Sequence, residues 1–467
     1  MKFRTLILLA VVALAGSISA FAGVNIIPYP QSVEMTETVF NKKNLDKVKF
    51  VKAKELPVEA YELQICKNKV VVAASSEAGY FYALQTLNQL AEADVMYCGT
   101  IKDAPRYEWR GMMFDESRHF FGKEKVKNLL DLMARYKLNR LHWHLSDNQS
   151  WRVEIKAYPK LCEIGAIGNH TDRNAPAKFY TQDEIREVVA YAAERHIEII
   201  PEIDMPGHTE AFGKAFPDLY AGYHTVNVAN PKLYEVLEVI MKELADLFPG
   251  RYIHIGGDEV SRRGWRSLPE MPEFMAKNNI ATYDDIQTYF EVRFSEIITK
   301  VGKIAIAWDD VINGDMNKEN TILHWWQSDR PQNLQKSLEY GYRTIFCPWG
   351  SHYLDYVQDA RCKEGQLVEK GFVNDLRKLY EYKYPDNPLV MGAQVNLWTE
   401  RVYTDERFGY MVFPRLIALA ENAWSPEANL NYEDFLERLA NEYKYLDSIG
   451  VYYYDYRNFE VHPEPYR

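Results

Sequence analysis

Two adjacent carboxylates mark the segment of this chain that is best suited to chemistry, residues 254–259 (HIGGDE). Gly256 and Gly257 let the backbone bend and approach a ligand closely, and Asp258 and Glu259 follow directly. Neighbours in a regular strand point to opposite faces, so both acids can serve one site only where a strand ends. The charges of two close carboxylates also push their pKa values apart, so that one group can stay protonated and act as a general acid while the other is ionised.

The elements that must position this pair recur from residue 109 onward. Eight short apolar runs, mostly separated by helical stretches, lie at 109–115, 140–147, 198–204, 252–259, 304–310, 321–327, 343–349 and 391–398. Helical periodicity is clear at 123–137, 182–195, 231–247, 283–301 and 432–447. This alternation predicts an α/β fold, a (β/α)8 TIM barrel. The connection between 310 and 321 is too short for a full helix and 350–390 is a long insertion, so we expect an irregular barrel.

The ends of these runs carry the polar residues that a barrel of this kind would use. The loops after the C-terminal strand ends build the active site of such barrels. Here those ends carry acids and indoles: Asp115, Asp147, Asp204, Asp258, Glu259, Trp308, Asp309, Asp310, Trp325, Trp326 and Trp398. No glycine-rich phosphate loop accompanies them in the sequence. The combination indicates a carbohydrate site, and the 33 Tyr, 21 Phe and 10 Trp residues agree with an aromatic cleft.

A separate small α+β domain is predicted at 23–106, before the barrel at 107–467 with its C-terminal helix. It contains the alternating run at 70–74 and a helical segment at 77–90. We expect a turn at Gly99 and a break at 103–105 before the barrel. The formal net charge of −11 and the lack of long basic runs argue against a nucleic-acid partner.

The N-terminus has the pattern of an export signal. Lys2 and Arg4 precede an apolar run at 5–15, and Ala20-Phe21-Ala22 fits a cleavage site, so residues 1–22 are predicted to be a signal peptide. No stretch reaches the ~20 apolar residues of a permanent membrane span. We therefore expect an exported protein, periplasmic or secreted.

Two further residue patterns bear on that compartment. Asn148 and Asn169 begin glycosylation sequons, yet a glycan at Asn148 would crowd Asp147, which favours a bacterial source. The five cysteines have no CxxC spacing and predict neither a disulfide framework nor a zinc site, although one bridge stays open.

The HIGGDE segment resembles the HxGGDE signature of family 20 glycoside hydrolases, the β-N-acetylhexosaminidases. Four more motifs are similar to that family's in the same order: RGMMFDESRHF at 110–120, HWHLSDNQSWR at 142–152, PEIDMPGH at 201–208 and GAQVNLWTE at 392–400. The segments IIPYPQSVE and SSEAGYFYALQTLNQL look like the small domain that precedes these barrels. The resemblance covers nearly the whole chain after the signal.

The resemblance implies an exo-acting, retaining hydrolase that removes terminal non-reducing N-acetylglucosamine or N-acetylgalactosamine from glycans, with no cofactor and no metal. Its mechanism would be substrate-assisted, an exception to ordinary two-carboxylate retention. Glu259 would protonate the glycosidic oxygen while the substrate's own acetamido carbonyl attacks C1. Asp258 would orient the acetamido group and stabilise the oxazolinium ion.

The resemblance also assigns the surrounding residues. Sugar binding falls to Arg118, Trp308, Trp326, Tyr353, Asp355, Trp398 and Glu400. Support of the catalytic pair falls to Asp147, His208, Asp204 and His254. Trp325 competes with Trp326 for one place in the pocket, because spacing does not separate them. The chain departs from the common pattern at Asn148-Gln149-Ser150 and at Glu116, which leaves the accessory subsites open.

Three other interpretations of the same residues are open. A metal-dependent barrel hydrolase could use His142, His144, His208 and His254 as ligands, but its His-x-His would sit on the second run rather than the first. A barrel that binds glycans without cleaving them is the second, and a lacto-N-biosidase-type specificity is the third. The natural glycan, the choice between the two hexosamines and the oligomeric state are not fixed by the sequence.

Overall fold

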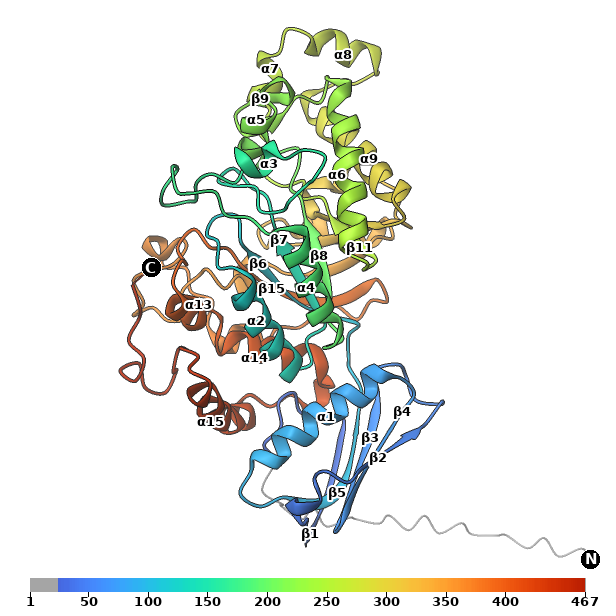
Figure 1. The fold of residues 1–467 in the computed structure, drawn as a ribbon, viewed down its shortest axis with the longest axis vertical. Helices are drawn as coiled ribbons and strands as arrows, with labels where there is room; N and C mark the ends of the chain where they lie inside the picture. Colours follow the sequence, from blue (N-terminus) through green and yellow to red (C-terminus); the bar gives the residue numbers. More distant parts are fainter. Residues whose placement is uncertain (1–23, 467) are drawn as a thin grey trace, which may run out of the picture.

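The computed structural model describes residues 24–466, and the predicted signal at 1–22 lies outside the described residues. A small α+β domain and a large barrel make up the molecule (Figure 1). The small domain has a five-stranded mixed sheet in the order β1-β5-β3-β4-β2. Its strands are β1 (Ser32–Val39), β2 (Val48–Lys52), β3 (Tyr61–Cys66), β4 (Lys69–Ala74) and β5 (Tyr97–Asp103), with α1 (Glu77–Glu92) and the short 3-10 helix η1 (Lys42–Asn44).

The turn predicted at Gly99 is wrong, because Gly99 lies inside β5. It pairs with Met35 of β1 on one side and with Ile65 of β3 on the other. A Cβ atom at this position would come within 2.5 Å of the Glu34 carbonyl oxygen. The glycine therefore permits a close approach of two strands, a role that sequence alone does not distinguish from a turn.

The eight predicted runs form the strands of a closed parallel barrel, in the order β11-β12-β13-β14-β15-β6-β7-β8. The strands are β6 (Trp109–Asp115), β7 (Arg140–His144), β8 (Glu198–Glu202), β11 (Tyr252–His254), β12 (Ile304–Trp308), β13 (Thr321–Trp325), β14 (Arg343–Phe346) and β15 (Val390–Leu397). The barrel is irregular as expected: β11 has three residues, and the β12–β13 connection holds only the 3-10 helix η3 (Asp309–Asn313).

Helices surround this barrel, and the five predicted ones are present with the predicted first residues and with last residues that differ by at most two. These are α2 (Lys123–Arg135), α4 (Gln182–Ala193), α6 (Pro231–Leu247), α9 (Tyr283–Lys300) and α15 (Tyr432–Ser448). Between them lie α3 (Lys160–Glu163), α5 (Glu210–Ala215), α7 (Arg263–Ser267), α8 (Met271–Lys277), α10 (Pro331–Glu339), α11 (Trp349–His352), α12 (Leu376–Tyr380), α13 (Asp405–Val412) and α14 (Arg415–Trp424). Short pieces complete the chain: the hairpin β9 (Tyr220–Gly222) and β10 (Thr225–Val226), and the 3-10 helices η2 (Pro217–Leu219), η4 (Val368–Lys370) and η5 (Glu427–Asn429).

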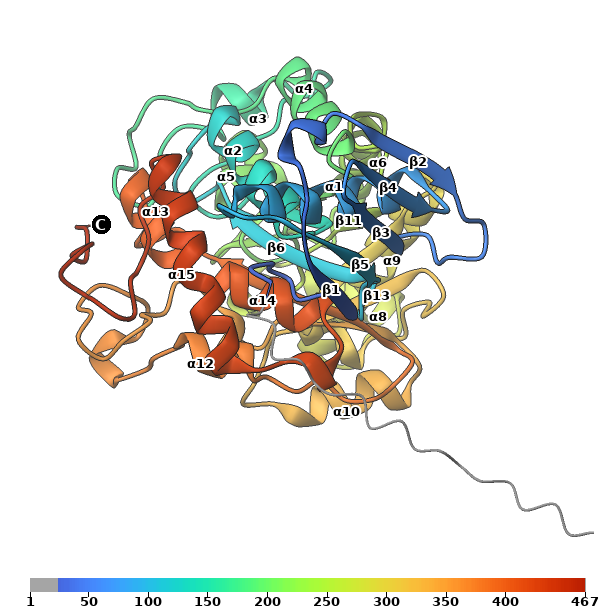
Figure 2. The ribbon, with the colours of Figure 1, turned by 90° about the horizontal axis from the view of Figure 1, so that it is seen from below.

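The small domain is fixed across the N-terminal end of the barrel, as the view from below shows (Figure 2). Trp424 of α14 belongs to the core of the small domain, where its ring packs edge-on against Tyr82 at 5.1 Å. Its indole N–H donates to Asp103, which also binds the buried Lys137 ammonium at 2.9 Å. This contact leaves the opposite, C-terminal end of the barrel free to carry a site.

Two sequence expectations concern the chain as a whole. All five cysteines are free thiols, so the bridge left open does not form. Among residues 24–466, no helix combines the length and apolar character needed to cross a bilayer.

Candidate active site

The HIGGDE segment leaves the barrel at the end of β11, before the two acids. Gly256 and Gly257 have φ values of 71° and 100°, which carry the chain sharply around Asp204. A Cβ on Gly256 would lie 1.8 Å from Asp204 Oδ1, which instead accepts a hydrogen bond from the Gly257 N–H at 3.2 Å. Glu259 also has a positive φ of 48°, which is unusual for a residue other than glycine. Both acids thus lie in one irregular loop beyond the strand.

The two acids occupy different environments. The Asp258 side chain is 10% exposed, whereas that of Glu259 is 62% exposed. Burial raises the pKa of Asp258 to about 6, although His208 opposes the shift. His208 lowers the pKa of Glu259. The two pKa values are therefore separated, as predicted. In the free protein, however, Asp258 has the higher pKa and Glu259 the lower one, because Glu259 is the solvent-exposed member of the pair. A general acid role for Glu259 needs the opposite order.

A chain of buried charges supports the pair. Asp147 accepts from His208 Nδ1 at 3.1 Å, and His208 Nε2 lies 3.6 Å from a carboxylate oxygen of both Asp258 and Glu259. Burial alone would lower the pKa of His208, but the carboxylates of Asp147 and Asp258 raise it well above its ordinary value. His208 is thus held as a cation between Asp147 and the catalytic pair.

Two members of this network were not among the residues assigned from the sequence, His144 and Glu202. His144 Nε2 lies 3.0 Å from Asp147 Oδ2, and its Nδ1 contacts Glu202. Glu202 also accepts from the Trp308 indole at 2.9 Å. Their positions in the HWH and PEID motifs, on β7 and β8, were the only signal that could have indicated them.

Arg118 is held at the pocket by residues at the ends of β6 and β15 and by Asp147. Asp115, the last residue of β6, accepts from the backbone N–H of Arg118 at 3.1 Å. The guanidinium lies 2.7 Å from Asp147 and 3.7 Å from Glu400, and it stacks over the Trp398 ring at 4.7 Å. Burial would lower the pKa of Arg118, but these carboxylates raise it well above its ordinary value. A fixed forked donor of this kind suits sugar hydroxyls.

An aromatic-walled pocket of about 420 Å³ opens beside these charges. Trp326, Tyr353 and Trp398 line it, and the first two rings stack at 6.2 Å and 18°. Asp310 of η3 holds the Trp326 indole N–H at 2.8 Å. Trp325 points away and packs on Phe346 at 5.3 Å, so Trp326 is the residue that faces the pocket.

Two further acids line the same pocket, Asp355 and Glu400. Asp355 is buried, and desolvation with the nearby charge of Glu400 raises its pKa well above the ordinary value. Its Oδ1 has no hydrogen-bond partner within residues 24–466. Asp258 Oδ1 has none in the same part of the chain. The pocket thus presents two buried acceptors to whatever enters it.

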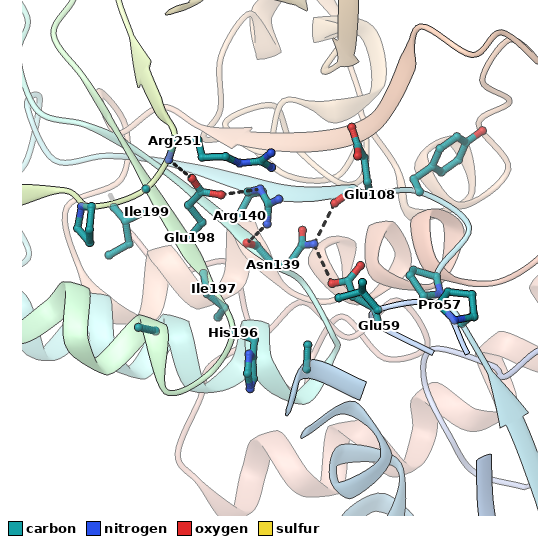
Figure 3. Close-up of a pocket in the computed structure, with 18 of the residues that line it drawn as sticks. Pro57, Glu59, Glu108, Asn139, Arg140, His196, Ile197, Glu198, Ile199 and Arg251 are labelled. Carbon is teal, nitrogen blue, oxygen red and sulfur yellow. Dashed lines mark hydrogen bonds and ion pairs between the residues drawn. The ribbon is translucent and has the colours of Figure 1, made fainter. Parts of the chain in front are cut away.

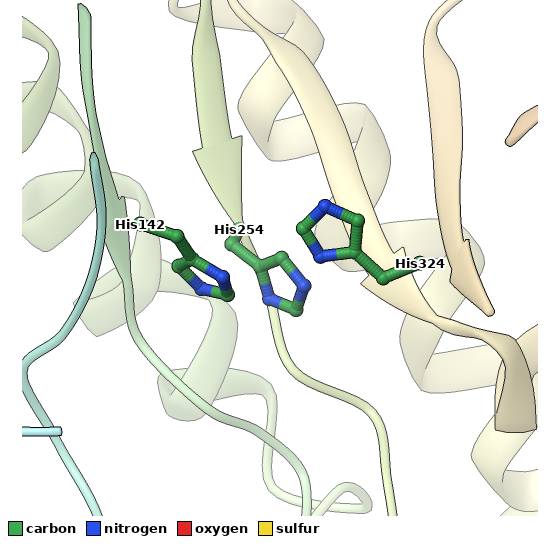
Figure 4. Close-up of side chains that lie close together, drawn as sticks. All are labelled: His142, His254 and His324. Carbon is green, nitrogen blue, oxygen red and sulfur yellow. The ribbon is translucent and has the colours of Figure 1, made fainter. Parts of the chain in front are cut away.

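Trp308 and His254 lie one layer below the pocket. Trp308 is 1% exposed and packs on Trp398 at 6.0 Å from beneath. Below it, His254, His142 and His324 form a buried cluster in the barrel interior (Figure 4). Desolvation lowers the pKa values of His142 and His324, so these rings are neutral. His254 therefore supports the floor of the pocket and does not face a ligand.

The metal-hydrolase interpretation also concerns the remaining imidazoles. Two other groups with ligand-like spacing contain His144 with Asp147 and Asp204, and His208 with Asp204 and Asp258. The adjoining carboxylates raise the pKa of His144 and of His208 well above the ordinary value, so both favour the protonated form. The cluster of His142, His254 and His324 lies below the pocket, with all three rings in contact with the Trp308 indole.

Fold and site together define a TIM-barrel protein with paired carboxylates and an aromatic-walled pocket at its C-terminal end. The family model described as glycosyl hydrolase family 20, catalytic domain, matches residues 107–427, and the model of that family's domain 2 matches residues 40–104. The chain belongs to glycosyl hydrolase family 20, which confirms the family resemblance of its motifs.

Named relatives and a solved structure agree with this placement. The chain is 35% identical over 435 residues to a beta-hexosaminidase of Porphyromonas gingivalis, covering 85% of this chain and 55% of that protein. It is 37% identical over 397 residues to a beta-hexosaminidase of Vibrio furnissii, covering 77% and 64%. The chain thus spans little more than half the length of these relatives. A family 20 exo β-N-acetylglucosaminidase from Vibrio harveyi, solved with N-acetylglucosamine, superposes with a TM-score of 0.84 at 32% identity, covering 92% of this chain and 78% of that chain.

Proposed function

We propose that this protein is an exo-acting, retaining β-N-acetylhexosaminidase that uses the 2-acetamido group of its substrate as the nucleophile. The observation that carries the proposal is Asp258, a buried carboxylate with one unpartnered oxygen beside the aromatic walls of the pocket. An acetamido N–H is the donor that such an oxygen lacks. Family membership and the printed activities of the relatives support the same reaction.

Glu259 supplies the proton in this reaction. The bound sugar would displace water from the exposed Glu259 side chain and so raise its pKa toward the protonated form that a general acid needs. As the acetamido carbonyl oxygen bonds to C1, the C1–O bond to the leaving group breaks and that oxygen takes the Glu259 proton. Water then gives a proton to Glu259 and attacks C1 from the face opposite the acetamido oxygen. The bond between C1 and that oxygen breaks, so the oxazolinium ring opens and the anomeric configuration is retained.

Asp258 and the walls supply orientation and charge. An intramolecular nucleophile that is already in place gains most from being held in one conformation. The Asp258 carboxylate offsets the positive charge of the oxazolinium ion, in a site too dry for water to do so. Trp326, Tyr353 and Trp398 hold the acetamido group and the ring against this charge.

The polar end of the pocket supports exo action. Arg118, Asp355 and Glu400 lie together at that end and would engage hydroxyls that only a terminal sugar has free. The expected product is a single N-acetylhexosamine. Release of a disaccharide instead would indicate the lacto-N-biosidase-type specificity, and binding without turnover would indicate the non-catalytic barrel.

Progressive fluorination of the N-acetyl methyl group tests the mechanism. Each fluorine withdraws electron density from the attacking carbonyl, so kcat/KM should fall stepwise from acetyl to trifluoroacetyl aryl glycosides. The matched 2-hydroxy glucoside should be nearly inert, because it lacks both the nucleophile and the partner of Asp258. A response of kcat/KM that is flat across the series, with a trappable adduct on Asp258, would contradict substrate assistance.

Export completes the proposal and is supported by residues 1–22 alone. The mature protein is expected to begin near Gly23 and to act in the periplasm or outside the cell. N-terminal sequencing of the protein recovered from each fraction of its own cells checks this. An intact Met1 in the cytoplasmic fraction would contradict it.

A further inference from the structure

A second hollow, of about 250 Å³, adjoins the catalytic pocket on the side of β7 and β8. The chain segments that form its walls continue directly from the active site. Asn148 follows Asp147, and its side chain accepts from the Glu210 N–H at 3.3 Å, two residues beyond His208. The other wall is a loop whose His170 N–H donates to the Arg118 carbonyl at 2.9 Å. The walls of the hollow therefore belong to segments that also carry Asp147 and His208, and one wall is hydrogen-bonded to the backbone of Arg118.

All the side chains that line this hollow are polar, and the balance among them is basic: Asn148, Gln149, Asn169, His170, Arg173, Glu210, Lys214 and His224. The one acid, Glu210, already has a partner, since its carboxylate lies 3.2 Å from His224 Nδ1. Arg173 and Lys214 have no side-chain hydrogen bond or ion pair to any other residue of 24–466. Two uncompensated cations thus face one hollow in a protein with a net charge of −11.

The loop that carries Arg173 is held in place by the active site. The Asn169 side chain accepts from the Thr171 and Asp172 backbone N–H groups at 2.9 and 2.7 Å. His119, next to Arg118, contacts the Thr171 hydroxyl at 3.2 Å and the Thr399 carbonyl at 2.6 Å. These contacts hold the backbone of the loop next to Arg173, whose exposed side chain extends from it.

We propose that this hollow is a subsite for an anionic group on the part of the substrate that follows the terminal sugar. The inference rests on the proposed function, because the substrate must lie with its leaving group at Glu259. Glu259 is the exposed acid of the pocket and lies 3.6 Å from His208 Nε2, and Glu210, two residues further along the chain, lines the hollow. A carboxylate of an acidic sugar, or a sulfate ester, beyond the scissile bond would find Arg173 and Lys214 unpaired.

Two matched substrate pairs distinguish the sources of the anion. One pair joins β-N-acetylglucosamine to O4 of a methyl glucuronide or a methyl glucoside. The other joins it to O3 of a methyl galactoside, with or without a 6-sulfate. We expect kcat/KM to favour the charged member of at least one pair by about three- to tenfold, the effect of one or two exposed ion pairs. The preference should shrink as the salt concentration rises from ~0.02 M to ~0.5 M.

The double variant Arg173→Gln/Lys214→Gln should abolish this preference while leaving the neutral members unchanged. Lys232 and Lys242, exposed on α6 and away from the hollow, give the matched control, since Lys232→Gln/Lys242→Gln makes the same change in charge. The carboxylate or the sulfate is identified by the pair that shows the preference. Equal rates within both pairs, or a preference that survives in the Arg173/Lys214 variant, would overturn the inference. Failure to cleave even the neutral members would overturn the proposed function instead.

Discussion

Two hollows lie at opposite ends of the barrel, and the adjacent acids Asp258 and Glu259 line the smaller one. The hollow at the N-terminal end, between the barrel and the small domain, has a volume of about 1080 Å³ (Figure 3). The catalytic pocket at the C-terminal end has about 420 Å³. Both are lined by acids and arginines, so neither size nor residue type distinguishes them. The difference lies in how their buried charges are paired.

At the N-terminal end, the two partly buried acids, Glu198 and Glu59, both have partners. Glu198 accepts from the Arg251 N–H at 2.5 Å and lies 3.5 Å from Arg140 Nε. Glu59 pairs with Arg110 at 2.9 Å, and although burial would raise the pKa of Glu59, Arg110 lowers it. These contacts tie the small domain and the first residues of the strands together. Glu59 and Glu198 are both engaged by these contacts.

At the C-terminal end, burial leaves acids without partners. Asp258 and Asp355 each have an unpaired carboxylate oxygen among the described residues, and the pKa of each is raised. A folded chain retains such groups at a cost in stability, which is the usual mark of a functional site. In this molecule, unpaired buried acids therefore locate the site and cavity volume does not.

The largest expected effect comes from Glu259→Gln. Removing general acid assistance should lower kcat about 10²–10⁴-fold on a sugar-linked substrate, with KM little changed. The loss should be smaller for an aryl leaving group that needs no proton. Steady-state kinetics on both substrates check this, and a near wild-type rate on the sugar-linked one would remove Glu259 from the mechanism.

Asp258→Asn should separate activity from stability. Because burial raises the folded-state pKa of Asp258 from 3.8 to about 6, ionising it costs the folded protein up to about 3 kcal/mol at neutral pH. The wild type loses this stability as the pH rises from about 4 to about 6. The variant should therefore equal wild type below about pH 4 and exceed it above about pH 6, while its activity is severely reduced. Denaturation at several pH values measures the difference, and a variant less stable than wild type at pH 8 would contradict the electrostatic cost.

The barrel was predictable from sequence because each strand is a short segment rich in apolar residues, as expected for parallel strands that are buried on both sides. The same logic located Asp115, Asp147 and Asp258 at one end. Gly99 was misassigned because a glycine needed for close strand contact has the same sequence signature as one in a turn.

The site was predictable in composition but not in its electrostatics. Which of Trp325 and Trp326 faces the pocket depends on where β13 ends and on the contact with Asp310. Which of Asp258 and Glu259 has the higher pKa depends on the exposure of Glu259 and on the position of His208. Glu202 was overlooked because a buried acid in the middle of an apolar run gives no sign of the side chains it will meet.

The smallest expected effect belongs to the N-terminal hollow and is the direct test of the comparison. Glu198→Gln keeps the shape of the side chain but weakens its bond to the Arg251 N–H and its contact with Arg140. The contact is partly exposed, so the cost should be about 0.5–1.5 kcal/mol, or a Tm shift of about 1 °C in a chain of this size. Hydrolysis should be unaffected, with kcat/KM within about twofold of wild type, since no acid there reaches the substrate. A folded Glu198→Gln protein with kcat/KM reduced more than about tenfold would show that the larger hollow contributes to function, and the distinction between paired and unpaired charges would fail.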